Sequence, residues 1–523
     1  MKGIVGRWIR ACRANPLPVV FFLIGAVVRL LYIGSIPGGL NQDEASIGYD
    51  AYAILHYGID RNGISLPIHL ISWGSGQNAL YAYLSIPFIW LFGLTPLSVR
   101  AVSIVMGLIG MLLFYLCAKA VFKSPLAGTT AMFFIAINPW HMMMSRWALE
   151  SNIFPTLILI AVYCLLRSIQ SPKWAYGFTV FAAMSLYAYG TAYFFVPVFV
   201  LCAAVYLLYK RVLTIRIVFW NALLFAFLAV PILLFIMINH WNLQGITLPF
   251  MSIPRLTMPR VEEISSVFGG DLLSAAGANF QVFLKLLISG GDGLAHNTIE
   301  PFGFAYPIAL PFALMGLIVM TRSLFLSTGE SVPEALVLIW ITTSVGMAFI
   351  TEVNVNRMNI FFYPFLLLVV QGFLWLFHKA KPAGIISAVA FSLCFALFTM
   401  VYFRDYPQSI DPAFYQSFGE AVQYASEESE GKVYVTDHVN MPYIYVLFYE
   451  KINPHDFAAT VEYVNPGEAF QRVSSFGKYV FGQPGITLGE KAAYIFWNGD
   501  NLPAVNGEYL IRRFANYTVI ITR

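Results

Sequence analysis

Charged residues are scarce in this sequence, and that shortage limits the classes of protein to which it can belong. Only 11% of the 523 residues are Asp, Glu, Lys or Arg, whereas a soluble globular domain usually carries about 25%. Hydrophobic residues make up 59% of the chain, and the mean hydropathy is +0.70. No water-soluble core of this size could bury so much apolar surface, so lipid must surround most of the chain. The net charge of +4 gives no indication of a nucleic-acid partner.

Cysteine is also rare, and it is confined to the apolar part of the chain. All five cysteines lie in the N-terminal tail or in hydrophobic segments, at Cys12, Cys117, Cys164, Cys202 and Cys394. The polar loops and the residues after 402 contain none. The polar parts of the chain therefore use no disulfide.

The N-terminus combines a basic tail with an apolar run from about Leu17 to Ile36. A signal peptide would begin in the same way, and the basic residues concerned are Lys2, Arg7, Arg10 and Arg13. The run is long enough to cross a bilayer, which takes roughly 20 residues. No clear small-residue cleavage site follows it. We therefore expect a retained first span.

Eleven further apolar stretches follow, near residues 79–93, 98–122, 125–143, 152–168, 173–190, 191–209, 216–238, 306–326, 335–351, 357–378 and 382–402. They predict a polytopic α-helical membrane protein with about 11–13 spans. The count of twelve conflicts with the orientation derived below, which needs an odd number of crossings. The conflict lies between 79 and 122, where either one stretch is re-entrant or interfacial or a span has been missed.

The orientation follows from the basic residues, because short cytoplasmic loops are rich in Lys and Arg. These residues gather in the N-terminal tail and at alternate junctions, at Lys119/Lys123, Arg167/Lys173, Lys210/Arg211/Arg216, Arg322 and His378/Lys379/Lys381. With these junctions inside, the polar loops at about 37–78 and 239–305 and the C-terminal region are outside. The sequence thus predicts a multi-pass protein of the cell membrane, with a membrane domain at 1–402 and an extracytoplasmic domain at 403–523.

The C-terminal region is predicted to be a small α/β domain. Residues Phe414–Ser426 have helical spacing, Lys432–Thr436 and Ala492–Trp497 are typical of buried strands, and Tyr509–Thr522 alternates like a strand pair. It contains no Gly-rich phosphate loop, no metal-ligand spacing and no serine-hydrolase elbow. Recognition or gating is therefore the expected role of this domain.

The first outer loop contains the densest group of residues that could do chemistry, from Asn41 to Asp50. Adjacent carboxylates, Asp43 and Glu44, lie close to the membrane edge, where partial desolvation raises a carboxylate's pKa and suits it to proton abstraction. A helix N-terminus that favours acidic residues would explain the same pattern. Tyr49 is a candidate for lining the cavity.

Two further groups lie at predicted outer junctions. Arg146 and Glu150 are four residues apart, so they would share one helix face and could simply pair, or the arginine could bind an anionic head group. Arg357 precedes a span, and its guanidinium suits phosphate oxygens, although snorkelling to the interface is the alternative. Arg29 lies near the outer end of the first span, where the same two interpretations apply.

Two histidines of the second outer loop complete the candidates. His240 and His296 could each line a cavity, although a single loop histidine is more often simply solvated. No group of residues has the spacing of a metal site, so we predict no metal and no cofactor.

These groups, in this order, resemble the GT-C class of membrane glycosyltransferases. The nearest likeness is to the dolichyl-phosphate-mannose–protein mannosyltransferases and the bacterial lipid A aminoarabinose transferases, over about residues 15–405. The matching stretches are Asp43-Glu44-Ala45 with Gly48-Tyr49 and Ala51-Tyr52, Phe92-Gly93 through Arg100, His141 with Ser145-Arg146 through Glu150, and Arg357 through Pro364.

The resemblance implies a sugar donor on a polyprenyl phosphate, transfer at the extracytoplasmic face with inversion, and Asp43 as the catalytic aspartate. Several relatives open the second span with a lysine that helps to bind the donor phosphate. This sequence has Gln77 and Asn78 there instead. Arg357 and Arg146 are the candidates to replace that lysine, with Arg29 as a third.

A polyprenyl-phosphate-sugar transferase is therefore the leading hypothesis, with membrane lipids around it and an acceptor that can be a protein, a glycolipid or a glycan. A transporter or flippase of a lipid-linked sugar is the alternative. It predicts internal repeats with interrupted half-helices, and no convincing repeat is present. A sensor that binds the donor without catalysis is the third possibility.

Overall fold

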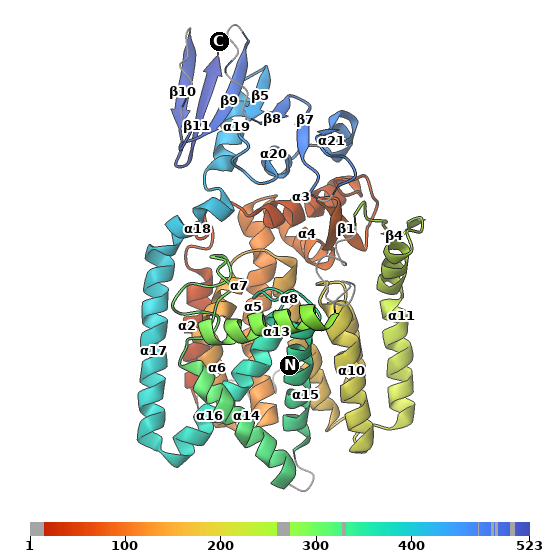
Figure 1. Ribbon diagram of the computed structural model, residues 1–523, viewed down its shortest axis with the longest axis vertical. Coiled ribbons are helices and arrows are strands. Elements are labelled where there is room, and N and C mark those ends of the chain that lie inside the picture. The colour runs from red at the N-terminus through yellow and green to blue at the C-terminus, as the bar shows by residue number, and fades with distance from the viewer. Residues whose placement is uncertain are drawn as a thin grey trace, which may run out of the picture.

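The computed structural model describes residues 15–258, 272–326, 331–468, 470–482, 486, 490–500, 502 and 508–522. A bundle of helices makes up most of the molecule, and a smaller domain built around a sheet stands on one end of it (Figure 1). The bundle comprises α2 (Leu17–Leu30), α5 (Pro96–Val121), α6 (Pro125–Ile137), α8 (Glu150–Ser168), α9 (Trp174–Ser185), α10 (Ala192–Tyr209), α11 (Ile215–His240), α14 (Ala309–Leu326), α15 (Val332–Gly346), α16 (Phe362–Lys379) and α17 (Lys381–Arg404).

The bundle confirms the predicted polytopic α-helical class. Over the described residues, 8 helices are long and apolar enough to cross a membrane. The helices α2, α6 and α4 (Leu80–Phe92) are apolar but shorter. The expected number of 11–13 crossings therefore stays a prediction.

The stretch between 79 and 122 contains one long helix and one short one. At 13 residues, α4 is about 20 Å long, which is less than the ~30 Å of a bilayer's hydrocarbon core. It lies beside α3 (Gln42–Tyr57) at the end of the bundle that carries the domain (Figure 1). The following helix, α5, has 26 residues. This arrangement favours the interfacial alternative for α4, with α5 as the one crossing.

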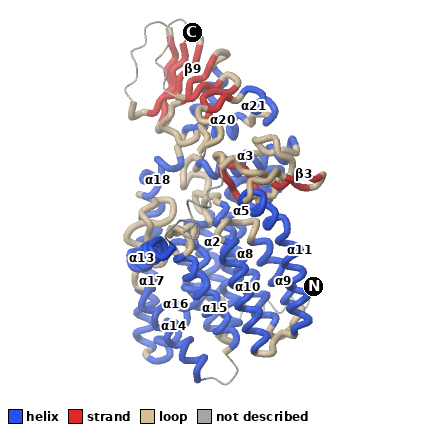
Figure 2. The backbone as a smooth tube through the Cα atoms, turned by 45° about the vertical axis from the view of Figure 1, so that its right-hand side comes forward, coloured by secondary structure: helices blue, strands red, loops and turns tan. Residues whose placement is uncertain are grey.

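The two polar loops contain structure of their own. The first holds α3 and a hairpin of β1 (His69–Ser72) and β2 (Ser75–Asn78). The second holds a hairpin of β3 (Ile246–Leu248) and β4 (Met251–Ile253) and the helix α13 (Leu272–Ser289). In Figure 1, α13 runs across the bundle, and Figure 2 shows it end-on. Short helices α7 (Pro139–Met144), η1 (Met347–Phe349) and η2 (Asn359–Phe361) lie between the long ones.

The C-terminal domain is a mixed α/β domain, as predicted. It comprises α18 (Tyr406–Phe414), α19 (Phe418–Glu428), β5 (Lys432–Val435), α20 (Pro442–Glu450), α21 (Pro454–Thr460), β6 (Glu462–Tyr463), β7 (Val473–Phe476), β8 (Tyr479–Phe481), β9 (Ala492–Trp497), β10 (Tyr509–Arg513) and β11 (Tyr517–Thr522). The sheet order is β10-β11-β9-β5-β8-β7-β6, and β5 runs parallel to both of its neighbours. The last two strands pair antiparallel, which confirms the predicted strand pair.

Close packing within the bundle depends on glycine at one crossing. A Cβ atom on Gly316 of α14 would lie 1.9 Å from the Leu368 carbonyl oxygen, and one on Gly372 of α16 would lie 2.0 Å from that of Phe312. Only glycine lets two helix backbones approach this closely, a device that is common between helices in membranes.

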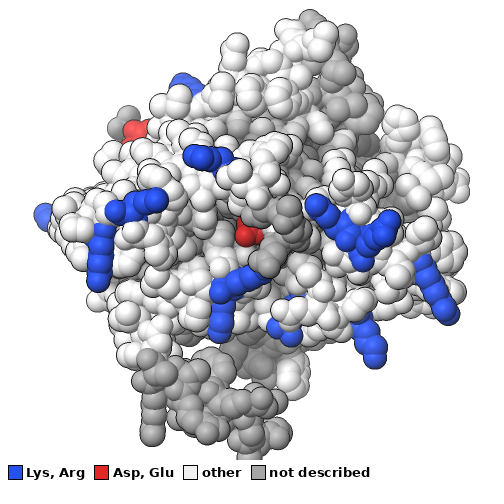
Figure 3. Space-filling view, turned by 90° about the horizontal axis from the view of Figure 1, so that it is seen from below, with Lys and Arg blue, Asp and Glu red and all other residues white. Residues whose placement is uncertain are grey.

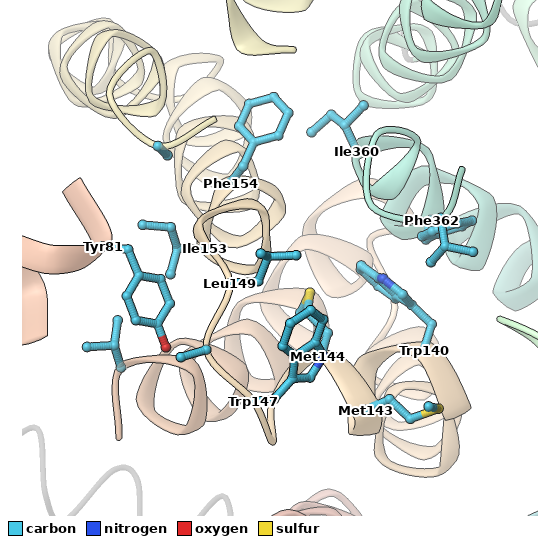
Figure 4. Close-up of a cluster of buried hydrophobic side chains, with 14 of the residues drawn as sticks. Tyr81, Trp140, Met143, Met144, Trp147, Leu149, Ile153, Phe154, Ile360 and Phe362 are labelled. Carbon is cyan, nitrogen blue, oxygen red and sulfur yellow. The ribbon is translucent and has the colours of Figure 1, made fainter. Parts of the chain in front are cut away.

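A cluster of aromatic and aliphatic side chains fills the bundle around the start of α8 (Figure 4). Trp147 and Leu149 precede α8, and Ile153 belongs to it, while Ile360 and Phe362 reach the cluster from η2 and α16. All five are buried. This packing fixes the position of Glu150, the first residue of α8.

The end of the bundle opposite the domain is basic. Figure 3 views that end, where Lys and Arg side chains are spread around the visible surface and acidic side chains are few. The charge distribution therefore agrees with the basic junctions read from the sequence.

Candidate active site

The site begins at the first turn of α3, whose geometry is fixed by a capping box. The Asp43 N–H donates to Asn41 Oδ1 at 3.0 Å, and the Asn41 N–H donates to Glu44 Oε2 at 3.0 Å. These two bonds satisfy backbone donors that a helix N-terminus otherwise leaves open. They also set the directions in which the two carboxylates leave the helix.

Both oxygens of the Glu44 carboxylate accept hydrogen bonds from other parts of the protein. Arg100 of α5 donates to both of its oxygens, from Nε to Oε1 at 2.8 Å and from Nη2 to Oε2 at 2.8 Å. The Ala148 N–H donates to Oε1 at 2.8 Å. Both side chains of the ion pair are completely buried. This geometry favours a role for Glu44 in holding α3 in place.

Asp43 differs from Glu44 because its side chain is half-buried and, within the described residues, forms no ion pair. Burial is the main influence, and it raises the pKa of Asp43 to about 6. A hydrogen bond from the Trp73 side chain and the charge of Arg61 oppose that rise, and Glu44 adds to it. A carboxylate with this pKa is ionised at neutral pH and is basic enough to accept a proton.

A second carboxylate, Glu150, lies near Asp43. Its Oε2 accepts a hydrogen bond from the Asn78 N–H at the end of β2, and its carboxyl group lies within electrostatic range of the Asp43 charge. The Asn78 side chain accepts a bond from the Tyr193 hydroxyl at 2.9 Å. Asn78 is therefore held through its backbone by Glu150 and through its side chain by Tyr193.

Arg357 brings a cation to the same place. Its guanidinium lies within electrostatic range of the Tyr189 hydroxyl, and so do the Glu150 and the Asp43 carboxyl groups. The Arg357 side chain is 17% exposed and also forms an ion pair with Glu352, whose side chain is 67% exposed. An exposed partner can be displaced by a ligand, so the guanidinium remains available to an anion.

The loop that carries Arg357 is anchored to the polar loop that follows α11. Asp292 accepts hydrogen bonds from the Val355 N–H at 2.9 Å and from the Asn297 side chain at 2.7 Å. The segments around residues 292 and 355, far apart in the sequence, are therefore held together beside the site.

The guanidinium groups of Arg29 and Arg146 are not available to an anion in this way. The Arg29 guanidinium is completely buried and donates to His141 Nδ1, at 2.7 Å from Nη2, and to the carbonyls of Gly25, Ile135 and Ala136. Arg146 is also completely buried, and it donates to the Tyr402 hydroxyl at 2.9 Å and to the carbonyls of Val28, Arg29 and Ile36. Arg146 does not pair with Glu150, the simple interpretation of their spacing. These contacts favour structural roles for both arginines.

The other candidates lie at the edges of the site. Tyr49 is buried, and its hydroxyl donates to the Ile452 carbonyl of the C-terminal domain at 2.7 Å. His296 packs edge-on against Trp147, with ring centroids 5.4 Å apart, and burial lowers its pKa. His240 is exposed at the end of α11, which lies at one margin of the bundle (Figure 1).

Sequence reasoning missed the site residues Trp73, Tyr189, Tyr193 and Arg61. The run Tyr187-Ala188-Tyr189-Gly190-Thr191-Ala192-Tyr193 lies where two apolar stretches meet, and its polar groups could have indicated a polar lining. Trp73 and Arg61 lie within the polar loop at about 37–78, where no local pattern distinguishes them. Over the described residues, no group of three or more His, Cys, Asp or Glu side chains is placed to hold a metal ion.

Comparison with known proteins agrees with this architecture. No protein-family profile and no curated protein sequence match the chain. Among solved structures, ArnT from Cupriavidus metallidurans bound to undecaprenyl phosphate is similar, with 14% sequence identity, a TM-score of 0.55, and coverage of 96% of this chain and 97% of ArnT. The apo state of that protein gives 12% identity and a TM-score of 0.54.

The oligosaccharyltransferase AglB from Archaeoglobus fulgidus, in complex with an inhibitory peptide and a dolichol-phosphate, is also similar, with 14% identity and a TM-score of 0.51. That match covers 84% of this chain and 64% of AglB, so the chain spans less than two thirds of the oligosaccharyltransferase. The chain therefore has the fold of GT-C membrane glycosyltransferases, shared with ArnT along nearly its whole length.

Proposed function

We propose that this protein is a glycosyltransferase that takes a sugar from a polyprenyl-phosphate donor and transfers it with inversion to an acceptor hydroxyl. The observation that carries the proposal is that a half-buried carboxylate, Asp43, and an available guanidinium, Arg357, both lie within electrostatic range of Tyr189 on a GT-C fold. The solved ArnT structure with undecaprenyl phosphate and the AglB structure with dolichol-phosphate support a lipid-phosphate donor.

The proposed reaction is a single displacement. Asp43 takes the proton of the acceptor hydroxyl while the hydroxyl oxygen attacks the anomeric carbon. The bond between that carbon and the phosphate oxygen breaks, and the polyprenyl phosphate leaves with the electron pair. Attack from the side opposite the phosphate inverts the anomeric centre, and Asp43 then releases its proton to water.

Arg357 would bind the donor phosphate and stabilise the charge that grows on it as the sugar leaves. Its exposed partner, Glu352, would give way to the phosphate oxygens. Tyr189 would lie near the guanidinium, and Glu150 would fix Asn78 next to the donor.

The orientation that we propose puts this site at the extracytoplasmic face. The opposite end of the bundle is the basic one (Figure 3), and the basic end of a membrane protein is normally cytoplasmic. Residues 1–402 would form the membrane domain and residues 403–523 an outer domain.

The proposal predicts that Asp43→Asn abolishes sugar transfer and leaves donor binding largely unchanged, because attack needs a base and binding does not. Transfer of labelled sugar from a polyprenyl-phosphate donor measures the first effect, and equilibrium binding of labelled donor measures the second. In the wild type, the rate should rise with pH through about 6, as the Asp43 carboxyl loses its proton.

Asp456→Asn is the matched control for this experiment, because Asp456 is exposed in the first turn of α21 in the C-terminal domain. It makes the same chemical change without affecting the site, so transfer should continue at the wild-type rate. Near-normal transfer by the Asp43→Asn variant would overturn the mechanism.

A further inference from the structure

A cavity of about 500 Å³ lies between α2, α6, α16 and α17, apart from the candidate active site. Each of these helices contributes to its lining, with Phe21, Thr129, Phe377 and Ala388 among the residues concerned. All four lie in the half of their helix that is nearer the basic end of the bundle, which Figure 3 shows. A volume of this size is typical of sites for small molecules and lipid chains.

One wall of the cavity is a single face of α17. Its residues recur at a helical spacing of four, which places their side chains together, and they are Gly384, Ile385, Ala388, Val389, Ser392 and Leu393. This helix stands at one margin of the bundle (Figure 1). The side chains of Ile385, Val389 and Leu393 remain exposed. The cavity is therefore open to the lipid that surrounds the bundle.

The other walls are largely aromatic. Phe21 of α2 meets Phe133 of α6 edge-on, with ring centroids 5.3 Å apart. On α16, Phe373 and Phe377 stack with centroids 6.1 Å apart. All four rings line the cavity. Because these rings pack against one another, they are held in place and keep the space between the helices open.

The lining offers a ligand mainly hydrocarbon. Two of the three hydroxyl groups in it donate to their own helices, from Thr129 Oγ1 to the Pro125 carbonyl at 3.1 Å and from Ser392 Oγ to the Ala388 carbonyl at 2.9 Å. The Thr129 hydroxyl also accepts a hydrogen bond from the Asn15 side chain at 3.1 Å. An alkyl chain fits such a lining, because it needs no polar partner.

Two cations lie next to this apolar space. Lys379 is the last residue of α16 and Lys381 is the first of α17, and both are exposed. The lining residue Phe377 comes two positions before Lys379, and Gly384 comes three positions after Lys381. At 1.5 Å per residue, the lysines are about 3–5 Å beyond the cavity along their helices. Basic groups beside a space between membrane helices attract anionic lipid head groups.

We propose that this cavity binds an acyl chain of an anionic phospholipid, whose head group contacts Lys379 and Lys381. The site is distinct from that of the sugar donor. The 24 residues of α17 span about 36 Å, and this length separates the two lysines from the end of the bundle that carries α3 and the C-terminal domain. The bound chain would fill the space between α17 and the helices α2 and α6. The proposal does not depend on the proposed catalytic function.

Lipid binding to the delipidated, full-length protein in detergent tests the proposal. Native mass spectrometry at matched lipid concentrations measures the binding of phosphatidylglycerol and of phosphatidylcholine. We expect one phosphatidylglycerol to bind about 25-fold more tightly than phosphatidylcholine, because each lysine near an anionic head group contributes about fivefold. Since the lipid binds the folded state, phosphatidylglycerol should also raise the midpoint of thermal unfolding.

Ala388→Trp tests the place of the chain, because an indole at position 388 occupies the cavity. Binding of phosphatidylglycerol should weaken by at least about tenfold, since the acyl chain loses its apolar site. Ala396→Trp is the matched control. Ala396 is exposed on the same helix and is not part of the lining, so this variant should bind phosphatidylglycerol like the wild type.

Lys379→Gln and Lys381→Gln test the head group. Each should weaken phosphatidylglycerol binding by about fivefold and leave phosphatidylcholine binding unchanged. Both lysines are exposed, so these variants should fold normally and test the proposal even if Ala388→Trp does not fold. Lys173→Gln is the control, because Lys173 is an exposed lysine before α9 and makes the same chemical change away from the cavity. It should bind phosphatidylglycerol with wild-type affinity.

Three results would overturn the proposal. Equal affinity for the two phospholipids would refute the role of the lysines. Wild-type binding of phosphatidylglycerol by a folded Ala388→Trp variant would place the acyl chain elsewhere. Displacement of phosphatidylglycerol by an equal concentration of polyprenyl phosphate would assign the cavity to the chain of the sugar donor. None of these results bears on the Asp43→Asn experiment, so the proposed function and this inference are tested separately.

Discussion

Arg29, Arg146 and Arg357 look alike in the sequence, since each lies near the outer end of an apolar segment. Their surroundings differ. The first two are completely buried and donate to backbone carbonyls, so they tie segments of the bundle together. Only Arg357 among the three keeps an exposed partner that a phosphate can replace. Spacing along the chain cannot distinguish these cases, because the carbonyls concerned belong to segments that are distant in sequence.

We predict that Arg357→Ala weakens donor binding by at least about tenfold, since contacts to charged groups are worth roughly 1.5–3 kcal/mol. Arg357→Lys should restore binding only in part, because an ammonium group lacks the two-pronged geometry of a guanidinium. Binding of labelled donor to the purified variants measures both effects.

Glu352→Gln is the control for this prediction. It weakens the competing ion pair and keeps Arg357, so donor affinity should be retained or increased. Normal donor binding by Arg357→Ala, together with lost binding by Arg146→Ala, would assign the phosphate to the other arginine.

At the scale of elements, α3 is the part of the structure on which the site depends. Its N-terminus is fixed by the capping box, and its first turn is fixed by the ion pair of Glu44 with Arg100. The same arginine donates to the carbonyls of Pro37 and Gly39 in the chain leading into α3. The buried pair therefore orients the helix that carries Asp43.

We predict that Arg100→Met destabilises the protein by about 3–5 kcal/mol, because it leaves the buried Glu44 carboxylate without its cation. The change should appear as a lower midpoint of denaturant unfolding in detergent. The double variant Glu44→Gln, Arg100→Met removes the stranded charge, so it should recover part of the loss. A single variant with wild-type stability would show that the pair does not hold α3.

The helices and strands could be predicted from the sequence better than the site residues, for physical reasons. Apolar runs of span length and the alternation in Tyr509–Thr522 are local patterns, and the structure has helices and a strand pair there. The acidic pair was also recognisable, because adjacent carboxylates at a membrane edge are rare. Trp73 and Tyr193 were not, since their contacts, with Arg61 and Asn78, are with residues to which no spacing points.

At the scale of the whole molecule, the C-terminal domain and the membrane bundle meet at the site. Tyr49 of α3 donates to the Ile452 carbonyl, and the Asn41 side chain donates to the Ala413 carbonyl at 3.1 Å. These contacts, with that of the Tyr443 ring against Trp73, make the domain a cover for the polar loop that carries α3. An enzyme that shields its reaction from bulk water would gain from such a cover.

The orientation of the molecule decides on which side of the membrane the reaction takes place. We predict that, in a variant without native cysteines, Glu430→Cys reacts with an impermeant thiol reagent in intact cells and Gln170→Cys does not. Both positions are exposed, the first between α19 and β5 and the second between α8 and α9, so accessibility to the reagent depends only on the side of the membrane. Position 431 is unsuitable, because a Cβ atom on Gly431 would lie 1.8 Å from the Lys491 carbonyl oxygen. After the membrane is permeabilised, both cysteines should react. The reverse labelling would put the domain and Asp43 on the cytoplasmic side and the basic loops outside. That arrangement would contradict the usual excess of Lys and Arg in cytoplasmic loops.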